Sequence, residues 1–354
     1  MSEGPGATMQ GVLGVAPREV RVVEVARPQL EPGTAIVRVR ASGICGSDLH
    51  LYRARGEPEM RPAGHEVAGE VVEIAPRPGE ASRLREGERV ALDTICLGRA
   101  CGECRWCREG APFHCESKRQ GPDWSGAFAE YVKRDVRGLF PLPQHVSLEE
   151  GALVEPLAVG VHAVRRAGLR PGETVAVIGA GTIGLTSVMA AKALGAGAVY
   201  ALARHPFQAE LALALGATAA LTDPPEEAAQ RVRQETGGGA DVVIETVGGH
   251  ASTLDQAWEL VRRRGRVIVL GVFEGAVPVR LWPPLGKEAD VRFANCYGEL
   301  DGRHDYDVTL ELIASGQAPV GRLLTHRFPL EEAPLAFRTA DDKASGAVKV
   351  QLIP

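Results

Sequence analysis

The amino-acid sequence predicts an α/β protein of two domains, an irregular antiparallel β domain and a doubly wound domain with a parallel sheet. Its 354 residues exceed the roughly 100–200 residues usual for one domain. Short strand-like runs separated by Gly and Pro fill the N-terminal part, and apolar runs alternate with helical stretches in the middle. With 45% hydrophobic and 24% charged residues, the composition is that of a globular protein able to bury large cores.

The β domain is expected from about Val12 to Val146, where turn residues interrupt short strands. These strands are VRVVEV at 20–25, AIVRVR at 35–40, EVAGEVVEI at 66–74 and ERVAL at 88–92. Gly and Pro clusters between such runs are typical of an irregular antiparallel sheet.

Beyond Pro156 the pattern changes to apolar, β-branched runs. They are TVAVIG at 174–179, AVYALA at 198–203, DVVIETVG at 241–248 and RVIVLGV at 266–272. Helical stretches lie between them, including PFQAELALALG at 206–216 and HASTLDQAWELVRR at 250–263. This alternation is typical of βαβ units around a buried parallel sheet.

The C-terminal part returns to mixed character, with a helix expected near 306–316 and a final strand at 347–353. If that strand rejoins the N-terminal sheet, the first domain is discontinuous. We therefore expect residues 1–152 and 291–354 to form one domain and residues 153–290 to form the other.

The charge balance gives no general electrostatic reason to bind nucleic acid or an anionic membrane, because 40 basic and 45 acidic side chains leave a net charge of −5. We expect the partners to be small molecules or copies of the same chain. The start, MSEGPGATMQ, lacks the apolar core of a signal peptide, and no run of about eighteen apolar residues occurs. A cytoplasmic location is expected, and it would keep metal-binding thiolates reduced.

The strongest motif is CGECRWCREGAPFHC, in which four cysteines have the spacing C-x2-C-x2-C-x7-C. Short loops bring four thiolates within reach of one tetrahedral ion, so residues 96–116 are predicted to form a structural zinc lobe. The ligands are Cys101, Cys104, Cys107 and Cys115. Reduced thiols or paired disulfides are the alternative. A closed all-thiolate site leaves no open position on the metal, so the chemistry must lie elsewhere.

The same lobe is locally basic, which raises the alternative of a nucleic-acid-binding ribbon. Its basic residues are Arg99, Arg105, Arg108, Lys118 and Arg119. The net charge of the whole chain argues against that alternative.

The sequence GAGTIG follows a predicted strand and opens a predicted helix, which is the context of a dinucleotide-binding turn. Gly179 permits the tight turn, Gly181 lets the backbone approach a pyrophosphate, and Gly184 allows the helix to pack closely on the strand. Amides at the helix N-terminus, at Thr182 and Ile183, then meet phosphate charge.

The end of the next predicted strand distinguishes NAD from NADP, because an acid there would bind the ribose 2′-hydroxyl of NAD. The sequence has Ala203, Arg204 and His205 at this point and no carboxylate. Arg204 can pair with a 2′-phosphate, so NADP is favoured. The alternative is that Arg204 stacks on adenine or points to solvent, which keeps NAD as a candidate.

A second set of candidate ligands lies in GICGSDLH at 43–50 and GHEVAGEV at 64–71. Cys45 and His65 offer a thiolate and an imidazole, a pair expected at a catalytic zinc, and Glu66 adds a carboxylate. As isolated residues, a Cys and a His more often belong to a core.

These motifs, with the run EPLAVGVHA at 155–163, occur in the order found in medium-chain, zinc-dependent alcohol and polyol dehydrogenases. The chain resembles that family, and in particular its sorbitol and threonine dehydrogenase branch, over nearly its whole length. The resemblance implies a GroES-like catalytic domain formed by both terminal segments, with a Rossmann domain between them. It also implies two zinc ions per subunit, and hydride transfer between a secondary alcohol, polyol or sugar hydroxyl and a nicotinamide cofactor.

By the same resemblance, Cys45 and His65 match zinc ligands, and Glu66 matches a neighbouring carboxylate that binds or supports the metal. The alcohol dehydrogenase ligand set contains a second cysteine, but its position is Glu155 here, as in the sorbitol and threonine branch. Whether Glu66, Glu155 or a water completes the coordination stays open, with Glu66 ranked first.

Two further residues are implied in proton transfer. Ser47 resembles the family's hydroxyl that contacts the alcohol, and His50 resembles the outer histidine that passes the proton toward solvent. Both can instead serve as hydrogen-bonding loop residues. Asp48 is expected either to orient a ligand or to cap the following turn.

Substrate identity is not encoded in any motif, and the loose candidates for pocket walls are Tyr52, Phe113 and Trp124. Apolar strands expected at 276–282 and 291–297 form an edge that favours pairing. In the resembling family such edges join two subunits, so a homodimer or homotetramer is expected.

The rival interpretation is a zinc-stabilised dinucleotide-binding protein without catalysis. A binding module has no need of an open metal site. The combination of Cys45, Ser47, His50, His65 and Glu66 therefore favours an enzyme.

Overall fold

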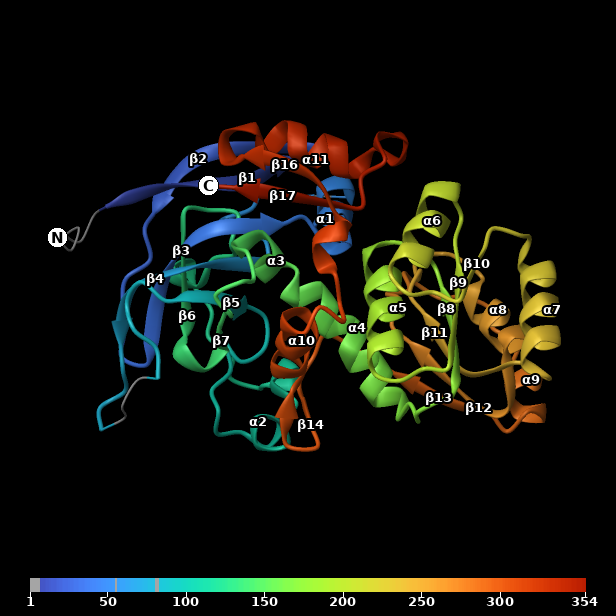
Figure 1. Ribbon diagram of the computed structural model, residues 1–354. Helices are drawn as coiled ribbons and strands as arrows, with labels where there is room; N and C mark the ends of the chain where they lie inside the picture. The colour runs from blue at the N-terminus through green and yellow to red at the C-terminus, as the bar shows by residue number, and fades with distance from the viewer. Residues whose placement is uncertain (1–6, 55, 80–82) are drawn as a thin grey trace. The chain divides into compact units, whose positions relative to one another are not determined.

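The computed structural model describes residues 7–54, 56–79 and 83–354, which divide into two compact units. The first unit contains the residues up to Glu155 together with Gly298–Leu310 and Val320–Pro354. The second contains Pro156–Tyr297 and Glu311–Pro319. Both terminal segments of the chain therefore lie in the first unit, where Figure 1 shows them in blue and red.

The first unit is built on a seven-stranded sheet with the order β16-β17-β3-β4-β5-β7, in which β6 also pairs with β3. The strands are β3 Thr34–Gly43, β4 Glu66–Ala75, β5 Arg89–Asp93, β6 Tyr131–Asp135, β7 Leu139–Pro141, β16 Leu324–Pro329 and β17 Lys349–Ile353. Val37 and Val39 of β3 share one buried apolar cluster with Val67 and Val71 of β4. Burial of these β-branched side chains fixes the pairing of the two strands.

Strand β17 joins the C-terminal segment to the N-terminal sheet. Leu352 pairs antiparallel with Ser42 of β3, and Gln351 pairs with Gly43. The expectation that the last strand returns to this sheet is confirmed. The pairing also brings the start of β17 next to the end of β3.

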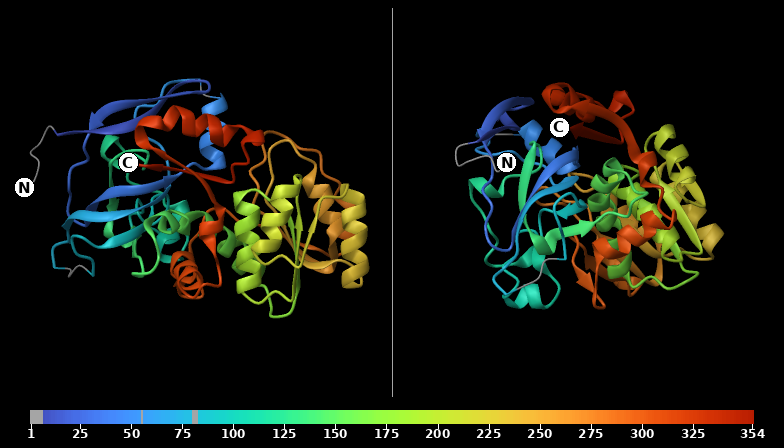
Figure 2. Two further views of the ribbon diagram at one scale, coloured as in Figure 1. Left: turned by 45° about the horizontal axis from the view of Figure 1, so that its top comes forward. Right: turned by 60° about the vertical axis from the view of Figure 1, so that its left-hand side comes forward.

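A hairpin and two helices share a second apolar cluster of the first unit. They are β1 Thr8–Ala16, β2 Glu19–Ala26, α1 Gly46–Ala54 and α11 Ala333–Asp341. Phe337 of α11 lies among them, with its ring centroid 5.4 Å from that of Tyr52 and 5.5 Å from that of Phe128. Figure 2 shows the hairpin and α11 on the same side of this unit.

Short elements occupy the loops of the first unit. They are α2 Arg105–Arg108, α3 Leu148–Ala152, β14 Glu299–Leu300, β15 Arg303–His304, and 3-10 helices at Pro112–His114, Pro122–Trp124, Val136–Gly138, Val320–Leu323, Leu330–Glu332 and Lys343–Ser345. Helix α10 Asp305–Ala314 begins in the first unit, and its residues from Glu311 onward belong to the second. Ser147 and Glu150 form a reciprocal capping box at the start of α3. Helix α4 Val154–Ala167 follows at once, so this cap helps to place Glu155.

The second unit is a six-stranded parallel sheet in the order β10-β9-β8-β11-β12-β13. The strands are β8 Thr174–Ile178, β9 Ala198–Leu202, β10 Ala219–Leu221, β11 Ala240–Glu245, β12 Val261–Val269 and β13 Asp290–Phe293. The chain adds β9 and β10 on one side of β8 and then β11, β12 and β13 on the other side. This is the order of a doubly wound sheet, and its topological switch lies between β8 and β11.

Helices cover both faces of this sheet, as the sequence alternation predicts (Figure 1). Helices α5 Thr182–Ala193 and α6 Pro206–Ala214 lie on one face, and α7 Pro225–Thr236 and α8 Thr253–Leu260 lie on the other. The short α9 Trp282–Gly286 precedes β13. Within the described part of the chain, none of the helices is long and apolar enough to cross a membrane.

Several sequence expectations differ from these elements. Residues 276–282 form no strand, because Pro278 lacks the amide hydrogen that a ladder needs. The helix expected to run through residue 263 ends at Leu260, because β12 begins at Val261, which pairs in parallel with Ala240 of β11.

The unit boundaries also differ from the expected ones. The first boundary lies after Glu155 rather than after residue 152. At the second boundary, β13 completes the parallel sheet, and the chain returns to the first unit at Gly298 rather than at residue 291. The reason is that β13 pairs with β12 from Asp290 to Phe293.

Candidate active site

The four predicted structural cysteines lie together in the first unit, with their sulfur atoms within 4.8 Å of one another. Sγ of Cys101 lies 3.5 Å from Sγ of Cys115 and 3.9 Å from Sγ of Cys107, and the Sγ atoms of Cys104 and Cys107 are 3.5 Å apart. Four thiolates about 2.3 Å from a tetrahedral ion lie about 3.8 Å from one another. Disulfides need S–S distances of about 2.05 Å, so this set fits one metal ion and not paired disulfides.

Backbone amides of the lobe point at these sulfur atoms. The amide of Cys101 donates to Sγ of Cys115 at 3.3 Å, and the amides of Glu103 and Cys104 donate to Sγ of Cys101 at 3.4 Å. Such donors favour the thiolate, and the amide of Cys107 is the largest cause that lowers the pKa of Cys104 to about 6. Burial raises the pKa of Cys107. A divalent ion would relieve the repulsion among four thiolates.

The second set of candidate ligands lies where β3 and β4 pair. Gly43 ends β3 and Glu66 begins β4, and the two residues are opposite each other in the ladder. Cys45 follows β3 and His65 precedes β4. One ligand atom from each of Cys45, His65 and Glu66 lies within 4.8 Å of the others. A Cβ on Gly43 would lie 2.0 Å from Oε2 of Glu66, so only glycine leaves room for this carboxylate.

The carboxylate of Glu66 is buried, and its two oxygens have different surroundings. Oε1 accepts a hydrogen bond from Nζ of Lys349 at 2.5 Å, and the same ammonium donates to the carbonyl of Ile44 at 3.0 Å. Oε2 has no hydrogen-bond partner among the described residues. A buried polar atom without a partner is costly, and zinc accepts a thiolate, an imidazole and a carboxylate as ligands. The residues present therefore fit the expected catalytic zinc.

Asp48 supports the loop that carries Cys45. Its Oδ2 accepts a hydrogen bond from the backbone amide of Cys45 at 2.8 Å, which caps the first turn of α1. Its Oδ1 lies 3.9 Å from Nδ1 of His65. Burial alone would lower the pKa of His65, but the negative charges of Cys45 and Asp48 raise this pKa well above 6.5. The folded site thus carries an excess of negative charge that favours a cation.

The other residues expected at this site lie outside the cluster of ligand atoms. Glu155 is buried in the first turn of α4, and its charge contributes to the raised pKa of His65. The described cluster within 4.8 Å includes Glu66 and not Glu155. Ser47 and His50 are exposed on α1, which begins directly after Cys45.

A cavity of about 520 Å³ adjoins His65 within the first unit. Its wall includes residues 59–65, Thr94, Ile95, Arg99, Lys118, Gly126 and Arg134. Trp124 and Phe113, two of the expected wall residues, contact lining side chains. The carbonyl of Trp124 accepts a hydrogen bond from Arg99, and Nζ of Lys118 lies 4.3 Å from the ring centroid of Phe113.

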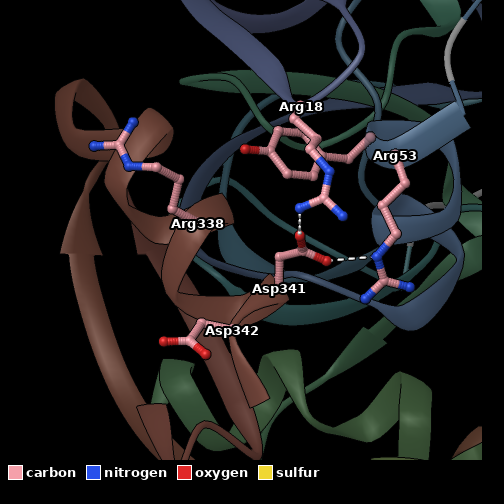
Figure 3. Close-up of a pocket in the computed structure, with 6 residues that line it drawn as sticks. Arg18, Arg53, Arg338, Asp341 and Asp342 are labelled. Carbon is pink, nitrogen blue, oxygen red and sulfur yellow. Dashed lines mark hydrogen bonds and ion pairs between the residues drawn. The ribbon is translucent and has the colours of Figure 1, made fainter. Parts of the chain in front are cut away.

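Tyr52, the third expected wall residue, borders a different cavity, of about 490 Å³ (Figure 3). Asp341 bridges two arginines there, accepting from Nη1 of Arg18 at 2.7 Å and from Nε of Arg53 at 2.5 Å. Arg338 stands apart from that bridge in Figure 3. Tyr52 is thus not in the wall of the cavity beside His65, because its ring packs on α11.

The glycine-rich turn connects β8 to α5 at the topological switch of the second unit. Gly179 has a φ of +94°, which favours glycine. A Cβ on Gly184 would lie 1.9 Å from the carbonyl oxygen of Gly179, whereas a Cβ on Gly181 would meet nothing within 4 Å. The turn is tight at the first glycine, open at the second and closely packed at the third. With the first amides of α5, at Thr182 and Ile183, it fits a dinucleotide pyrophosphate.

Arg204 lies just beyond the C-terminal end of β9, which ends at Leu202. Its side chain is exposed, and residues 203–205 hold no carboxylate. A guanidinium is therefore available where the ribose of a bound dinucleotide is expected.

Sequence reasoning missed two buried charged residues. Lys349 lies in the apolar run AVKVQLI, and a lysine in a buried strand signals a partner elsewhere in the fold. Glu245 ends β11, and its Oε1 accepts hydrogen bonds from the amides of Val247 and Gly248 at 2.7 and 3.0 Å. Glu245 thereby shapes the loop beside the topological switch. Its position at the end of a predicted strand is the sequence feature that could have identified it.

Comparison with known families gives matches in both units. Residues 31–144 match the alcohol dehydrogenase GroES-like domain, and residues 182–315 match the zinc-binding dehydrogenase domain. The first matched segment contains both cysteine-containing clusters described above.

Similar proteins include dehydrogenases of small polyols. The chain is 32% identical to sorbitol dehydrogenase of Bacillus subtilis (strain 168) over 346 residues, which cover 95% of each chain. It is 35% identical to erythritol/L-threitol dehydrogenase of Mycolicibacterium smegmatis over 377 aligned positions, which cover 100% of each chain. The solved structure of a zinc-binding dehydrogenase from Sinorhizobium meliloti 1021, bound to NADP, matches with a TM-score of 0.83 and 31% identity, covering 98% of this chain and 100% of that one.

Proposed function

The chain belongs to the zinc-dependent, medium-chain alcohol and polyol dehydrogenases, and we propose that its substrates are polyols or sugars with a secondary hydroxyl. It is an oxidoreductase that transfers a hydride between an alcohol and a nicotinamide cofactor. The polyol class is supported by the two relatives described above, whose names give sorbitol and erythritol or L-threitol as substrates.

In this proposal Cys45, His65 and Glu66 hold the catalytic zinc, and Glu155 is the second candidate carboxylate. The observation that carries the assignment is the buried Oε2 of Glu66, which lacks a hydrogen-bond partner beside a thiolate and an imidazole. When bound, zinc supplies a Lewis acid that lowers the pKa of the substrate hydroxyl.

Ser47 and His50 move the proton that the hydroxyl loses. Oxidation sends a hydride from the alcohol carbon to the nicotinamide of NAD(P)⁺ and releases the hydroxyl proton, so the carbonyl and NAD(P)H form together. The hydroxyl of Ser47 accepts that proton and donates its own hydroxyl proton toward His50. His50 in turn releases a proton to solvent. Their exposure on the helix that follows Cys45 supports this role.

The four-cysteine lobe holds a second zinc, which is structural because all its ligands are protein thiolates. In this scheme the first unit, which carries both clusters, is the GroES-like catalytic domain. The second unit is the Rossmann domain that binds the dinucleotide.

NADP is the favoured cofactor, and NAD is the alternative. The exposed Arg204 supports NADP, because a guanidinium pairs with a 2′-phosphate where an acid would bind the ribose of NAD. Similar proteins of known structure were solved with NADP and with NADH, so the preference for NADP rests on Arg204.

A homodimer or homotetramer is proposed from an exposed apolar patch around α9 and β13, the last strand in its sheet. The side chains are Val272, Leu281, Trp282, Leu285 and Phe293, which are 68–77% exposed. Patches of this kind mark interaction surfaces. Light scattering on the purified protein measures the expected mass of two or four chains.

The cytoplasm is the proposed compartment. Both clusters need reduced cysteines, and the five cysteines of these clusters form no disulfide bond in the described residues. A reducing compartment maintains that state.

A substrate panel tests the proposed function. Purified protein is assayed with polyols, sugars, amino alcohols and simple secondary alcohols, each with NAD⁺ and with NADP⁺. We expect polyols to have the highest kcat/KM and NADP⁺ to be the better cofactor. Preference for a simple alcohol would contradict the polyol class, and preference for NAD⁺ would contradict the role of Arg204. Dinucleotide binding without turnover of any alcohol would favour the non-catalytic alternative.

A further inference from the structure

The cavity beside His65 is lined by cationic side chains. Arg61, Arg99 and Lys118 all belong to its wall, together with the buried Arg134, and Glu59 is the acid of that wall. We propose that the substrate carries an anionic group, a phosphate ester or a carboxylate, which Arg61, Arg99 and Lys118 bind while its hydroxyl is oxidised beside His65. This inference rests on the proposed polyol oxidation and names the substrate class of the same site.

The two arginines are held in place by backbone carbonyls rather than by acids. Nη1 of Arg61 donates to the carbonyl of Gly121 at 2.8 Å, and Nη2 of Arg99 donates to the carbonyl of Trp124. Gly121 and Trp124 lie three residues apart in the chain. The two hydrogen bonds therefore fix Arg61 and Arg99, which come from separate segments of the wall, against the same short stretch of backbone. Each guanidinium has five N–H donors, so a single carbonyl leaves most of them available. Nε of Arg99 is buried and has no partner among the described residues.

The positive charge of these side chains is not neutralised by the protein. Among the described residues, no carboxylate lies within ion-pair distance of Arg61, Arg99 or Lys118. By contrast, two neighbouring arginines pair with one carboxylate: Arg119 lies 3.1 Å from Asp135 of β6, and Arg137 lies 2.9 Å from it. Asp135 therefore neutralises charge on these two arginines, whereas the three cations of the cavity wall stay available for another partner.

The acid of the cavity wall does not reverse this charge balance. Oε2 of Glu59 accepts a hydrogen bond from the backbone amide of Gly14 at 2.8 Å, which ties the carboxylate to β1. Lys118 is half-buried with its ammonium over the ring of Phe113. Such an arrangement keeps the ammonium near the cavity and limits its freedom.

The size of the cavity suits such a substrate. Ligand pockets for small molecules span about 300–1,000 Å³, and this one measures about 520 Å³. Because His65 belongs to the wall, a four- to six-carbon polyol can present a hydroxyl near the proposed metal ligands and its anionic end to the arginines. The anionic group takes no part in the redox step. It supplies orientation and selectivity, since paired guanidiniums bind phosphate and carboxylate in a fixed geometry.

Matched substrates test this inference. A neutral polyol, its terminal phosphate monoester and the aldonate of the same carbon chain are compared with zinc-loaded protein and the preferred cofactor. We expect kcat/KM for one anionic form to exceed that for the neutral polyol by about 10- to 100-fold, the range for hydrogen bonds to charged groups. The phosphate and aldonate arms identify which anion the site takes.

Variants locate the effect. Arg61→Gln, Arg99→Gln and the milder Lys118→Gln should each lower the ratio of anionic to neutral kcat/KM at least threefold, with the loss in KM. Arg61→Lys and Arg99→Lys should restore part of the ratio because they keep the charge. Arg85→Gln is the matched control, since this exposed arginine of the same unit lies outside the cavity wall. Zinc content and circular dichroism confirm that each variant folds.

Binding of inorganic phosphate gives a readout that does not depend on turnover. It is titrated calorimetrically into protein saturated with NADPH, and we expect binding that weakens at least threefold in Arg61→Gln and Arg99→Gln but not in Arg85→Gln. Equal kcat/KM for neutral and anionic substrates in a working enzyme would overturn the inference and leave the polyol dehydrogenase intact. Failure of all alcohols, with phosphate binding still dependent on Arg61, would instead contradict the proposed function.

Discussion

Nζ of Lys349 lies 2.5 Å from Oε1 of Glu66, and the two side chains are only 2% and 0% exposed. The pair joins β17 to β4 across a sequence separation of 283 residues. Burial would lower the pKa of Lys349, but the charges of Glu66 and Cys45 outweigh it and raise this pKa. Lys349 therefore offsets part of the negative charge that the proposed zinc ligands gather, and it leaves Oε2 of Glu66 free for the metal.

Replacing Lys349 by methionine should destabilise the metal-free protein by about 3 kcal/mol, because it leaves a buried carboxylate uncompensated. The loss should be smaller with zinc bound, since the ion supplies positive charge to the same carboxylate. Urea unfolding with and without a chelator measures both values.

Lys133→Met is the matched control for Lys349→Met. Lys133 is also fully buried, and it pairs with Glu31 at 2.6 Å, on the same sheet but away from the ligand cluster. The free energy of unfolding should therefore fall by the same amount in Lys133→Met with and without zinc. A zinc-independent effect at Lys349 would contradict the link between this lysine and the metal site.

The pH dependence of the metal-free protein should report His65. Its pKa is raised well above 6.5 in the folded protein by Cys45 and Asp48, which outweigh burial. The folded state binds the proton of His65 more tightly than the unfolded state does. Protonated His65 therefore stabilises the folded protein fully below about pH 6.5, and this stabilisation is lost as the pH rises through the raised pKa. The free energy of unfolding, measured with chelator from pH 6 to 9, should fall more in the wild type than in His65→Gln.

The zinc affinity of this site should rise between pH 6 and 9, whereas the stability of the metal-free protein falls. A metal binds the neutral imidazole, so zinc must displace the proton of His65 at low pH. Competition with a chromophoric chelator should show zinc binding more tightly as the pH rises. An affinity of this site that does not vary with pH would mean that His65 is not a ligand.

Zinc analysis should count two ions per subunit and separate the two sites. Cys45→Ser should leave one equivalent and a stable fold without turnover. Cys104→Ser should also leave one equivalent but lower the melting temperature, because a structural zinc contributes to folding.

The matched pair Glu66→Gln and Glu155→Gln addresses the third ligand of the catalytic zinc. Because Glu66 lies within the ligand cluster and Glu155 does not, Glu66→Gln should weaken zinc retention on dialysis more than Glu155→Gln. The reverse order would identify Glu155 as the ligand.

Local motifs predicted the parts of the molecule that depend on neighbours in sequence. The turn at Gly179 and the cysteines of the lobe belong to this group, because a short loop fixes their geometry by itself. The alternation of strands and helices after Pro156 also predicted the order of elements in the second unit. In contrast, the run at 276–282 has the apolar pattern of a strand, and the pattern takes no account of the amide hydrogen that Pro278 lacks.

Residues brought together by tertiary pairing could not be predicted in the same way. Lys349 reaches Glu66 only because β17 pairs with β3, and its register is set by burial rather than by a motif. The cationic cavity combines Arg61, Arg99 and Lys118 from three loops. The sequence showed the lobe to be basic, but it could not show which arginines have acids beside them and which face the cavity.

Ser47→Ala should lower turnover by about 100-fold, the lower end of the range for positioned acid–base groups. The side chain is exposed, and no buried packing depends on it, so zinc content and melting temperature should stay at wild-type values. Ser47→Thr keeps the hydroxyl and should recover most of the activity, which a purely steric role would not explain. The measurement is steady-state kcat from pH 6 to 9 for all three proteins. If Ser47→Ala turns over like the wild type, the proton leaves by another path and His50 loses its proposed donor as well.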